Sequence, residues 1–255
     1  MPRTEALSDE ERARYRRDGY LVLRGVFTIS EMDAVAQWVG DMADHPEQRG
    51  TIMKYFEDDS ANPGRRILNR IENFVPFHDG FRSLATAGPI VDFSSELLGA
   101  PAVLFKDKIN FKLPGGSGFE PHQDIQAGWG VYTDSFISVS VAIDETTIEN
   151  GCLELAAGHH TQGLVGRLLE PLNAEELAGI AFEPVLQAPG DVVFFDAYTP
   201  HCSAPNRTAK PRRNLYLTYN KAAAGDLRDR YFADKRASFP PDSEREPGKT
   251  YSYRV

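Results

Sequence analysis

From residue 101 onward the chain is a succession of short apolar or alternating runs separated by Gly, Pro, Asn and Asp. The clearest runs cover 103–112, 136–143, 152–155, 192–195 and 212–219. Regularly spaced runs of this length, with turn signals between them, are typical of a β-sandwich or barrel and not of a helical domain. The sequence therefore predicts a β-rich core over about residues 101–222.

The region before residue 101 has a helical pattern. A capping box at Ser8–Glu11 predicts a first helix, in which the two side chains satisfy each other's backbone amides. Apolar residues at helical spacing predict a second helix from Ser30, and the segment Gly88–Gly99 has the start and stop signals of a third. Helices are thus expected over about residues 1–100, with one more possible at 226–236.

Composition and charge exclude several classes of partner. The 255 residues carry a net charge of -9, which gives no basic surface for nucleic acid or an anionic membrane. No apolar run approaches the ~20 residues of a membrane helix, and Met1–Glu10 is too polar for a signal peptide. We expect one cytoplasmic domain spanning 1–255, with free thiols at Cys152 and Cys202 and a small molecule as partner. The oligomeric state stays open.

Three residues suggest a metal site. His122 and Asp124 are two positions apart, so on a strand they would point to the same side. His201 follows a turn and an apolar strand at 190–195, and a folded sheet could bring it to the same place. Two imidazoles and one carboxylate leave three positions open on an octahedral iron, although zinc accepts the same ligands.

Basic residues supply two further candidate sites. Arg212 and Arg213 begin the last long strand, and a planar guanidinium there could hold a carboxylate by two parallel hydrogen bonds. Lys106, Lys108 and Lys112, with Asn110 between them, would share one face of the strand 103–112. Three ammonium groups on one face favour an anionic partner, unless that face is simply a solvated edge.

The ordered set of motifs resembles the phytanoyl-CoA dioxygenase-like family of iron(II)/2-oxoglutarate oxygenases over nearly the whole chain. The matching segments are Asp18–Gly25, Lys108–Gly115, Pro121–Asp124, Asn150–Glu154, Gly158–His160, Gly190–Phe195 and His201–Asn206. In this family an arginine follows the distal histidine by eleven positions, which falls on Arg212.

The resemblance implies a mainly β fold with flanking helices, the double-stranded β-helix or jelly roll. It implies an enzyme that uses Fe(II), 2-oxoglutarate and O2 to hydroxylate an unactivated C–H bond, with release of succinate and CO2. The metal ligands would be His122, Asp124 and His201. The residues similar to those that bind 2-oxoglutarate are Arg212, Lys112, Ser203 and, more loosely, Arg70; those expected at the substrate are Lys106, Lys108, Asn110 and Trp129.

The substrate class is less constrained than the chemistry. We expect a small polar and anionic metabolite, with an acyl-CoA or a natural-product intermediate as the alternative. Halogenases of the family replace the ligand carboxylate by a small residue, so Asp124 argues against that activity. A redox-neutral zinc protein and a non-catalytic jelly-roll binding protein are the alternatives from other classes.

Overall fold

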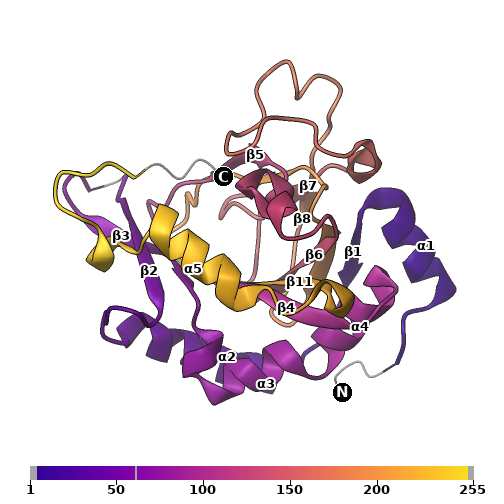
Figure 1. Cartoon of the computed structure of the whole chain (residues 1–255), viewed down its shortest axis with the longest axis horizontal. Helices are drawn as coiled ribbons and strands as arrows, with labels where there is room; N and C mark the ends of the chain where they lie inside the picture. The colour runs from indigo at the N-terminus through magenta and orange to yellow at the C-terminus, as the bar shows by residue number, and fades with distance from the viewer. Residues whose placement is uncertain (1–4, 61, 252–255) are drawn as a thin grey trace.

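Two antiparallel sheets face each other in the computed structural model, which describes residues 5–60 and 62–251 (Figure 1). The larger sheet has the strand order β1-β9-β6-β11-β4-β3-β2, and the smaller has the order β5-β10-β7-β8. The strands are β1 (Tyr20–Leu23), β2 (Met53–Asp58), β3 (Arg66–Glu72), β4 (Ala102–Lys112), β5 (Phe119–His122), β6 (Phe136–Ala142), β7 (Leu153–Leu155), β8 (Glu183–Val185), β9 (Val192–Asp196), β10 (His201–Ser203) and β11 (Arg212–Lys221). This arrangement is the expected jelly roll.

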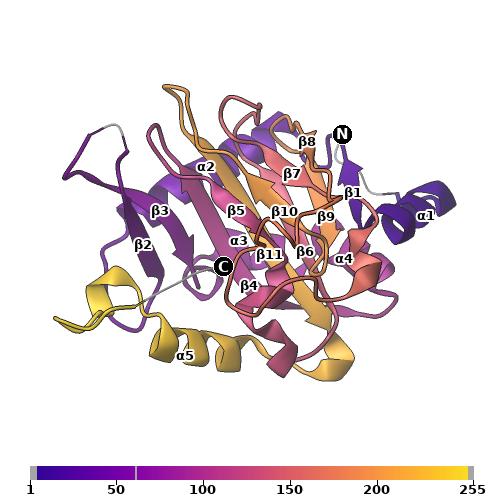
Figure 2. The same cartoon turned by 90° about the horizontal axis from the view of Figure 1, so that it is seen from above.

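Helices cover the outer face of the larger sheet. In Figure 1, α2, α3 and α4 lie together on one side of it, and Figure 2 shows α5 running beside β4. The helices are α1 (Asp9–Asp18), α2 (Ile29–Asp44), α3 (Asp79–Thr86), α4 (Pro89–Leu98) and α5 (Arg228–Ser238), with short 3-10 helices η1 (Val75–Phe77), η2 (Asp124–Ala127), η3 (Trp129–Val131), η4 (His159–Gln162), η5 (Ala222–Ala224) and η6 (Asp242–Glu244).

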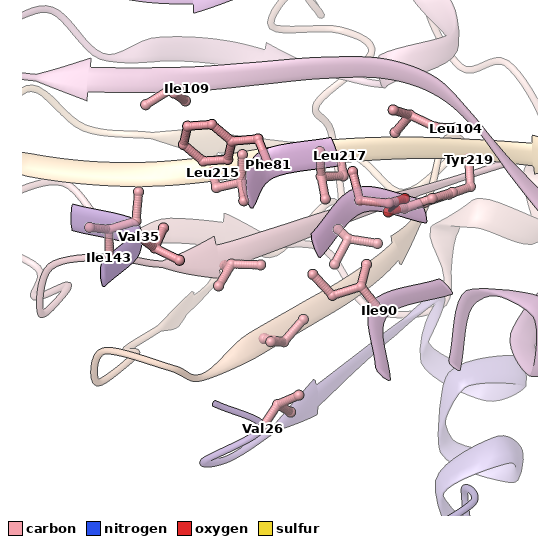
Figure 3. Close-up of a cluster of buried hydrophobic side chains, with 14 of the residues drawn as sticks. Val26, Val35, Phe81, Ile90, Leu104, Ile109, Ile143, Leu215, Leu217 and Tyr219 are labelled. Atoms are coloured by element: carbon pink, nitrogen blue, oxygen red, sulfur yellow. Dashed lines mark hydrogen bonds between the residues drawn. The ribbon is translucent and has the colours of Figure 1, made fainter. Parts of the chain in front are cut away.

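The main hydrophobic core lies between these helices and the larger sheet. Val35, Phe81 and Ile90 from the helices pack against strand residues such as Ile109 and Leu215 (Figure 3). All five are at most 2% exposed. Burying aliphatic and aromatic side chains here is the main stabilising contribution, and it fixes which face of the sheet is left for the site.

Strand β4 shows how alternation separates the core from the site. Ile109 and Phe111 point into the helix-covered core. The intervening Lys108, Asn110 and Lys112 point to the opposite face, because successive strand residues alternate. The Lys-rich face is therefore turned toward the smaller sheet, and Lys112 is only 2% exposed. The solvated-edge interpretation of this face is wrong.

Helix α2 begins one residue before the expected position. Thr28 is its N-cap, and Glu31 completes the capping box, so the helix starts at Ile29 and not at Ser30. The first capping box, Ser8 with Glu11, is present as predicted.

Three elements in the N-terminal part were not predicted. Strands β2 and β3 extend the larger sheet beyond β4, and α3 precedes α4. The pattern was hidden because these strands bury charged residues: Lys54, Arg70 and Glu72 are all at most 7% exposed. Such burial is made possible by partners that the folded chain brings together: Lys235 pairs with Glu72, and Lys54 donates to the carbonyls of Ala43 and His45.

Two further observations concern membrane-spanning helices and the cysteines. Within the described residues, no helix combines the length and apolarity needed to cross a bilayer. Cys152 and Cys202 are free thiols, as expected.

Candidate metal centre and its pocket

His122, Asp124 and His201 converge between the two sheets. His122 ends β5 and is the direct cross-strand partner of His201 on β10. One ligand atom from each of the three residues lies within 4.8 Å of the others. The expectation that one strand carries both His122 and Asp124 is wrong, since Asp124 begins the 3-10 helix η2. The turn, and not strand alternation, directs its carboxylate toward the histidines.

Backbone carbonyls orient both imidazole rings. The Nδ1 of His122 lies 2.6 Å from the carbonyl of Glu120, and that of His201 lies 3.0 Å from the carbonyl of Thr199. A carbonyl only accepts, so each Nδ1 carries the proton and each Nε2 keeps a free lone pair. Burial lowers the pKa of both histidines. Both are therefore neutral near pH 7, as a metal ligand must be.

Ser138 fixes the carboxylate of Asp124. Its hydroxyl donates to Oδ2 over 2.5 Å, while Oδ1 faces the Nε2 of His201 at 3.8 Å. Burial alone would raise the pKa of Asp124, but His201 and Lys108 together lower it. Two neutral imidazoles and one oriented carboxylate fit a divalent transition metal, and iron(II) with open positions is the typical occupant of this set.

Two glutamines beside Asp124 hold the ligand turn. Gln123 and Gln126 are both 0% exposed. The backbone N–H of Gln123 donates to the side-chain Oε1 of Gln126 over 2.7 Å. The Nε2 of Gln123 donates to the carbonyls of Gly163 and Tyr198, at 2.8 and 2.6 Å.

The segment 163–172 is fastened to the turn by the same residues. The Nε2 of Gln126 donates to the carbonyls of Arg167 and Glu170, each at 2.8 Å, and Val165 N–H donates to the Oε1 of Gln123. Sequence reasoning did not single out these glutamines. The two amide side chains flank a candidate metal ligand, which could have marked them as residues that hold it. Their partners were not predictable, because these lie about 40 residues away in sequence.

Arg212 and Lys112 form a buried pair of cations at one end of the site. They are direct cross-strand partners on β11 and β4, at 1% and 2% exposure. Lys112 Nζ donates to Ser203 Oγ over 2.6 Å, and Arg212 donates to the carbonyl of Gly151, which Lys112 also contacts at 3.2 Å. Burial, and then the neighbouring Arg212, lower the pKa of Lys112 to about 6.

This pair has the properties of an anion site. Among the described residues, the Nε of Arg212 is buried without a hydrogen-bond partner. Two adjacent buried basic groups without a carboxylate cannot both be charged without a large cost until an anion joins them, in agreement with the lowered pKa of Lys112. Ser203 lines the cavity itself, whereas Lys112 and Arg212 are not among the described lining residues and contact Ser203 and Gly151.

Arg213 points the other way. It forms a two-bond ion pair with Asp144, with both N–O distances at 2.8 Å, and its side chain is 25% exposed. The two neighbouring arginines thus occupy opposite faces of β11, as alternation requires.

The other end of the cavity is lined by Lys106, Lys108, Asn110 and Trp129, and Arg70 lines the part that adjoins it. All the residues expected at the substrate are therefore brought together beside the metal ligands. Lys106 lies over the ring of Trp129, at 5.1 Å from its centroid. Burial, and then Lys106, lower the pKa of Lys108 to about 7.

Helix α5 packs behind this end of the cavity through Lys235, a contribution that the sequence did not reveal. Lys235 pairs with the fully buried Glu72 at 2.5 Å, and Arg70 pairs with the same carboxylate at 2.9 Å. Burial opposes ionisation of Glu72, but Lys235, Lys106 and Arg70 outweigh it and lower its pKa. One carboxylate thus faces several cations, and the wall keeps an excess of positive charge.

The model of the phytanoyl-CoA dioxygenase (PhyH) family matches residues 15–214. The chain belongs to this family. Its histidine–aspartate–histidine cluster and jelly roll make this PhyH member an iron(II)- and 2-oxoglutarate-dependent dioxygenase.

Two curated relatives cover almost all of this PhyH member. A 2-aminoethylphosphonate dioxygenase from the uncultured bacterium HF130_AEPn_1 is 37% identical over 246 residues, which are 96% of this chain and 94% of the relative. A methylphosphonate hydroxylase from Gimesia maris is 40% identical over 234 residues, covering 91% and 88%.

Solved structures agree on the fold. EctD from S. alaskensis, solved with 2-oxoglutarate and 5-hydroxyectoine, superposes with a TM-score of 0.71 at 24% identity, over 88% of this chain and 80% of EctD. The carbocyclase SnoK from nogalamycin biosynthesis superposes with a TM-score of 0.72 at 21% identity, over 87% of each chain.

Proposed function

We propose that this dioxygenase hydroxylates a C–H bond of a small anionic metabolite, and that the anionic group is a phosphonate. The observation that carries the proposal is the excess of cations at the substrate end: the buried Lys106 and Arg70 and the half-buried Lys108, against the single carboxylate of Glu72. Relatives named for 2-aminoethylphosphonate and methylphosphonate support the same class. A phosphonate offers three oxygens to several donors at once.

Each group of residues has a proposed task. His122, Asp124 and His201 would hold iron(II), through the two Nε2 atoms and the carboxylate oxygen that Ser138 leaves free. When bound, iron(II) with 2-oxoglutarate and dioxygen supplies the oxidation that inserts one oxygen atom into the C–H bond and leaves succinate and carbon dioxide. The protein's own residues determine which molecules reach the metal and in what orientation.

At the co-substrate end, Arg212, Lys112 and Ser203 would bind the distal carboxylate of 2-oxoglutarate. The carboxylate would satisfy the free Nε of Arg212 and neutralise the cation pair. For Arg70 we propose a role at the substrate and not at 2-oxoglutarate, to which the loose resemblance had assigned it. It lies beside Lys106 and Lys108, so we assign it to the substrate end.

At the substrate end, Lys106, Lys108 and Arg70 would hold the phosphonate oxygens. Trp129 adds a donor, because its Nε1 is buried without a hydrogen-bond partner among the described residues. Asn110 lies between the two ends of the Lys-rich face and lines the cavity. Since the proposed site residues come from β3 through β11, we propose that the whole chain acts as one catalytic domain.

The test is succinate formation across a panel of candidate substrates. Purified protein with iron(II), 2-oxoglutarate and dioxygen would receive an alkylphosphonate, 2-aminoethylphosphonate, an amino acid or an acyl-CoA, with a zinc-loaded sample as control. We expect a phosphonate to increase succinate formation and to be consumed in equal amount. Stimulation by the acyl-CoA or the amino acid but by no phosphonate would refute the proposal.

A further inference from the structure

The substrate end of the cavity offers no carboxylate to a positively charged substrate group. Among the described residues that line the cavity, Asp124 is the single acidic side chain, and it is oriented toward His201 for the metal. An ammonium group entering this space would meet Lys106, Lys108 and Arg70 instead. Like charges at close range in a poorly solvated site repel strongly.

The nearest buried carboxylate, Glu72, is already engaged. It is 0% exposed and pairs with Arg70 at 2.9 Å and with Lys235 at 2.5 Å. Withdrawing it toward a substrate would leave these buried cations without their counter-ion, which is strongly destabilising. Glu72 therefore balances part of the wall's charge and does not serve as a subsite for an ammonium.

Aromatic rings can also bind an ammonium, but the rings of this cavity already have cations or a histidine against them. Lys106 lies 5.1 Å from the centroid of Trp129, and Lys108 lies 4.9 Å from that of Tyr216 and 5.5 Å from that of Phe119. The ring of Phe195 packs against His201. A cation–π site needs an open ring face, and a lysine in that place repels a second cation.

We infer that the phosphonate is the only charged group of the substrate, and that the carbon chain attached to it is short and uncharged. This inference rests on the proposed function and deepens it. Leu153, Phe195 and Phe119 supply apolar surface to the same cavity, which suits an alkyl chain. The structure thus distinguishes between the two kinds of phosphonate for which the relatives are named, and favours the alkyl kind.

The test compares two substrates of nearly equal shape. Propylphosphonate and 2-aminoethylphosphonate differ in the replacement of a terminal methyl group by an ammonium. The holoenzyme would receive each at pH 7, and kcat/KM would be measured from succinate and from hydroxylated phosphonate. We expect kcat/KM for propylphosphonate to be at least about tenfold higher, since a single unfavourable charge contact in such a site is worth more than ~1.4 kcal/mol.

A substitution tests whether the lysines cause the preference for propylphosphonate over 2-aminoethylphosphonate. Lys108→Met removes one cation and keeps most of the side-chain volume, so the ratio of the two kcat/KM values should fall at least about threefold. The exposed Lys210→Met is the matched control and should leave the ratio unchanged.

Three outcomes would overturn the inference. Equal or faster turnover of 2-aminoethylphosphonate refutes it while phosphonate hydroxylation stands. A ratio that Lys108→Met does not change shows that charge is not its cause. Turnover of neither phosphonate, with succinate still formed on another substrate of the panel, refutes the proposed function, and the inference fails with it.

Discussion

Replacing Arg212 by alanine should weaken 2-oxoglutarate binding far more than the same change at Arg213. Arg212 is 1% exposed and pairs across the strands with Lys112, whereas the Arg213 side chain is 25% exposed and paired with Asp144. Removing one partner of a buried charge pair costs ~2–5 kcal/mol. Because Lys112 remains, we expect the lower part of that range, about 2–3 kcal/mol, which corresponds to a ~30- to 150-fold higher KM for 2-oxoglutarate.

Arg213→Ala is the matched control. It removes a partly exposed ion pair, worth ~0.5–1 kcal/mol of folding stability, and it leaves the buried face of β11 intact. The assay is the initial rate of succinate formation against 2-oxoglutarate concentration, at saturating iron(II) and substrate, with urea unfolding of each variant alongside. We expect a less than about threefold change in KM for Arg213→Ala. The reverse ranking of the two variants would refute the assignment of Arg212 as the carboxylate clamp.

The remaining predictions concern the lysines and the ligand turn. Lys112→Met should weaken 2-oxoglutarate binding and slow the decarboxylation of 2-oxoglutarate that occurs without substrate. Lys106→Met and Lys108→Met should leave that uncoupled reaction unchanged and impair phosphonate hydroxylation. Wild-type kinetics in all three variants would contradict the proposed roles. Because Lys112 has a pKa near 6 when its carboxylate partner is absent, and because a bound carboxylate raises it, 2-oxoglutarate affinity should be highest below about pH 6 and fall by up to tenfold per unit above it. Lys112→Arg, which stays charged, should remove that slope in an isothermal titration, and a flat wild-type profile would argue against it. Gln126→Ala should lower the affinity for metal by ~10- to 100-fold, because residues that orient the metal ligands have effects of this size. The control is Gln187→Ala, which removes a similarly buried glutamine away from the cavity and should leave metal affinity unchanged. Equal effects of the two changes would show that Gln126 contributes only to packing.

Local pattern predicted much of the fold correctly. The capping box at Ser8, the alternation of β4 and the apolar run of β9 depend on near neighbours in sequence, and each element formed where expected. Strands β2 and β3 were missed because their buried charges need partners that the local pattern does not show, such as Lys235 on α5 for Glu72 and the carbonyls of Ala43 and His45 for Lys54. Sequence periodicity cannot represent that compensation.

The candidate site, like the fold, was predicted from the sequence only where local residues determine the structure. His122 and His201 were found from residue type and family motif, and their cross-strand pairing is present. The backbone conformation at Asp124 was not predicted, because a 3-10 turn held by Gln123 and Gln126 replaces the expected strand. The partners of those glutamines, in segment 163–172, become neighbours only when the loop folds back over the turn.

The central claim is that His122, Asp124 and His201 bind the catalytic iron, and the most direct measurement is iron(II) binding together with succinate formation in the three single alanine variants. His159→Ala, a histidine outside the cavity-lining set, is the control. The account predicts loss of iron binding and of succinate formation in all three, with circular dichroism and the unfolding midpoint close to wild type, and no loss in the control. Near wild-type iron binding and succinate formation in any one of the three would contradict the claim.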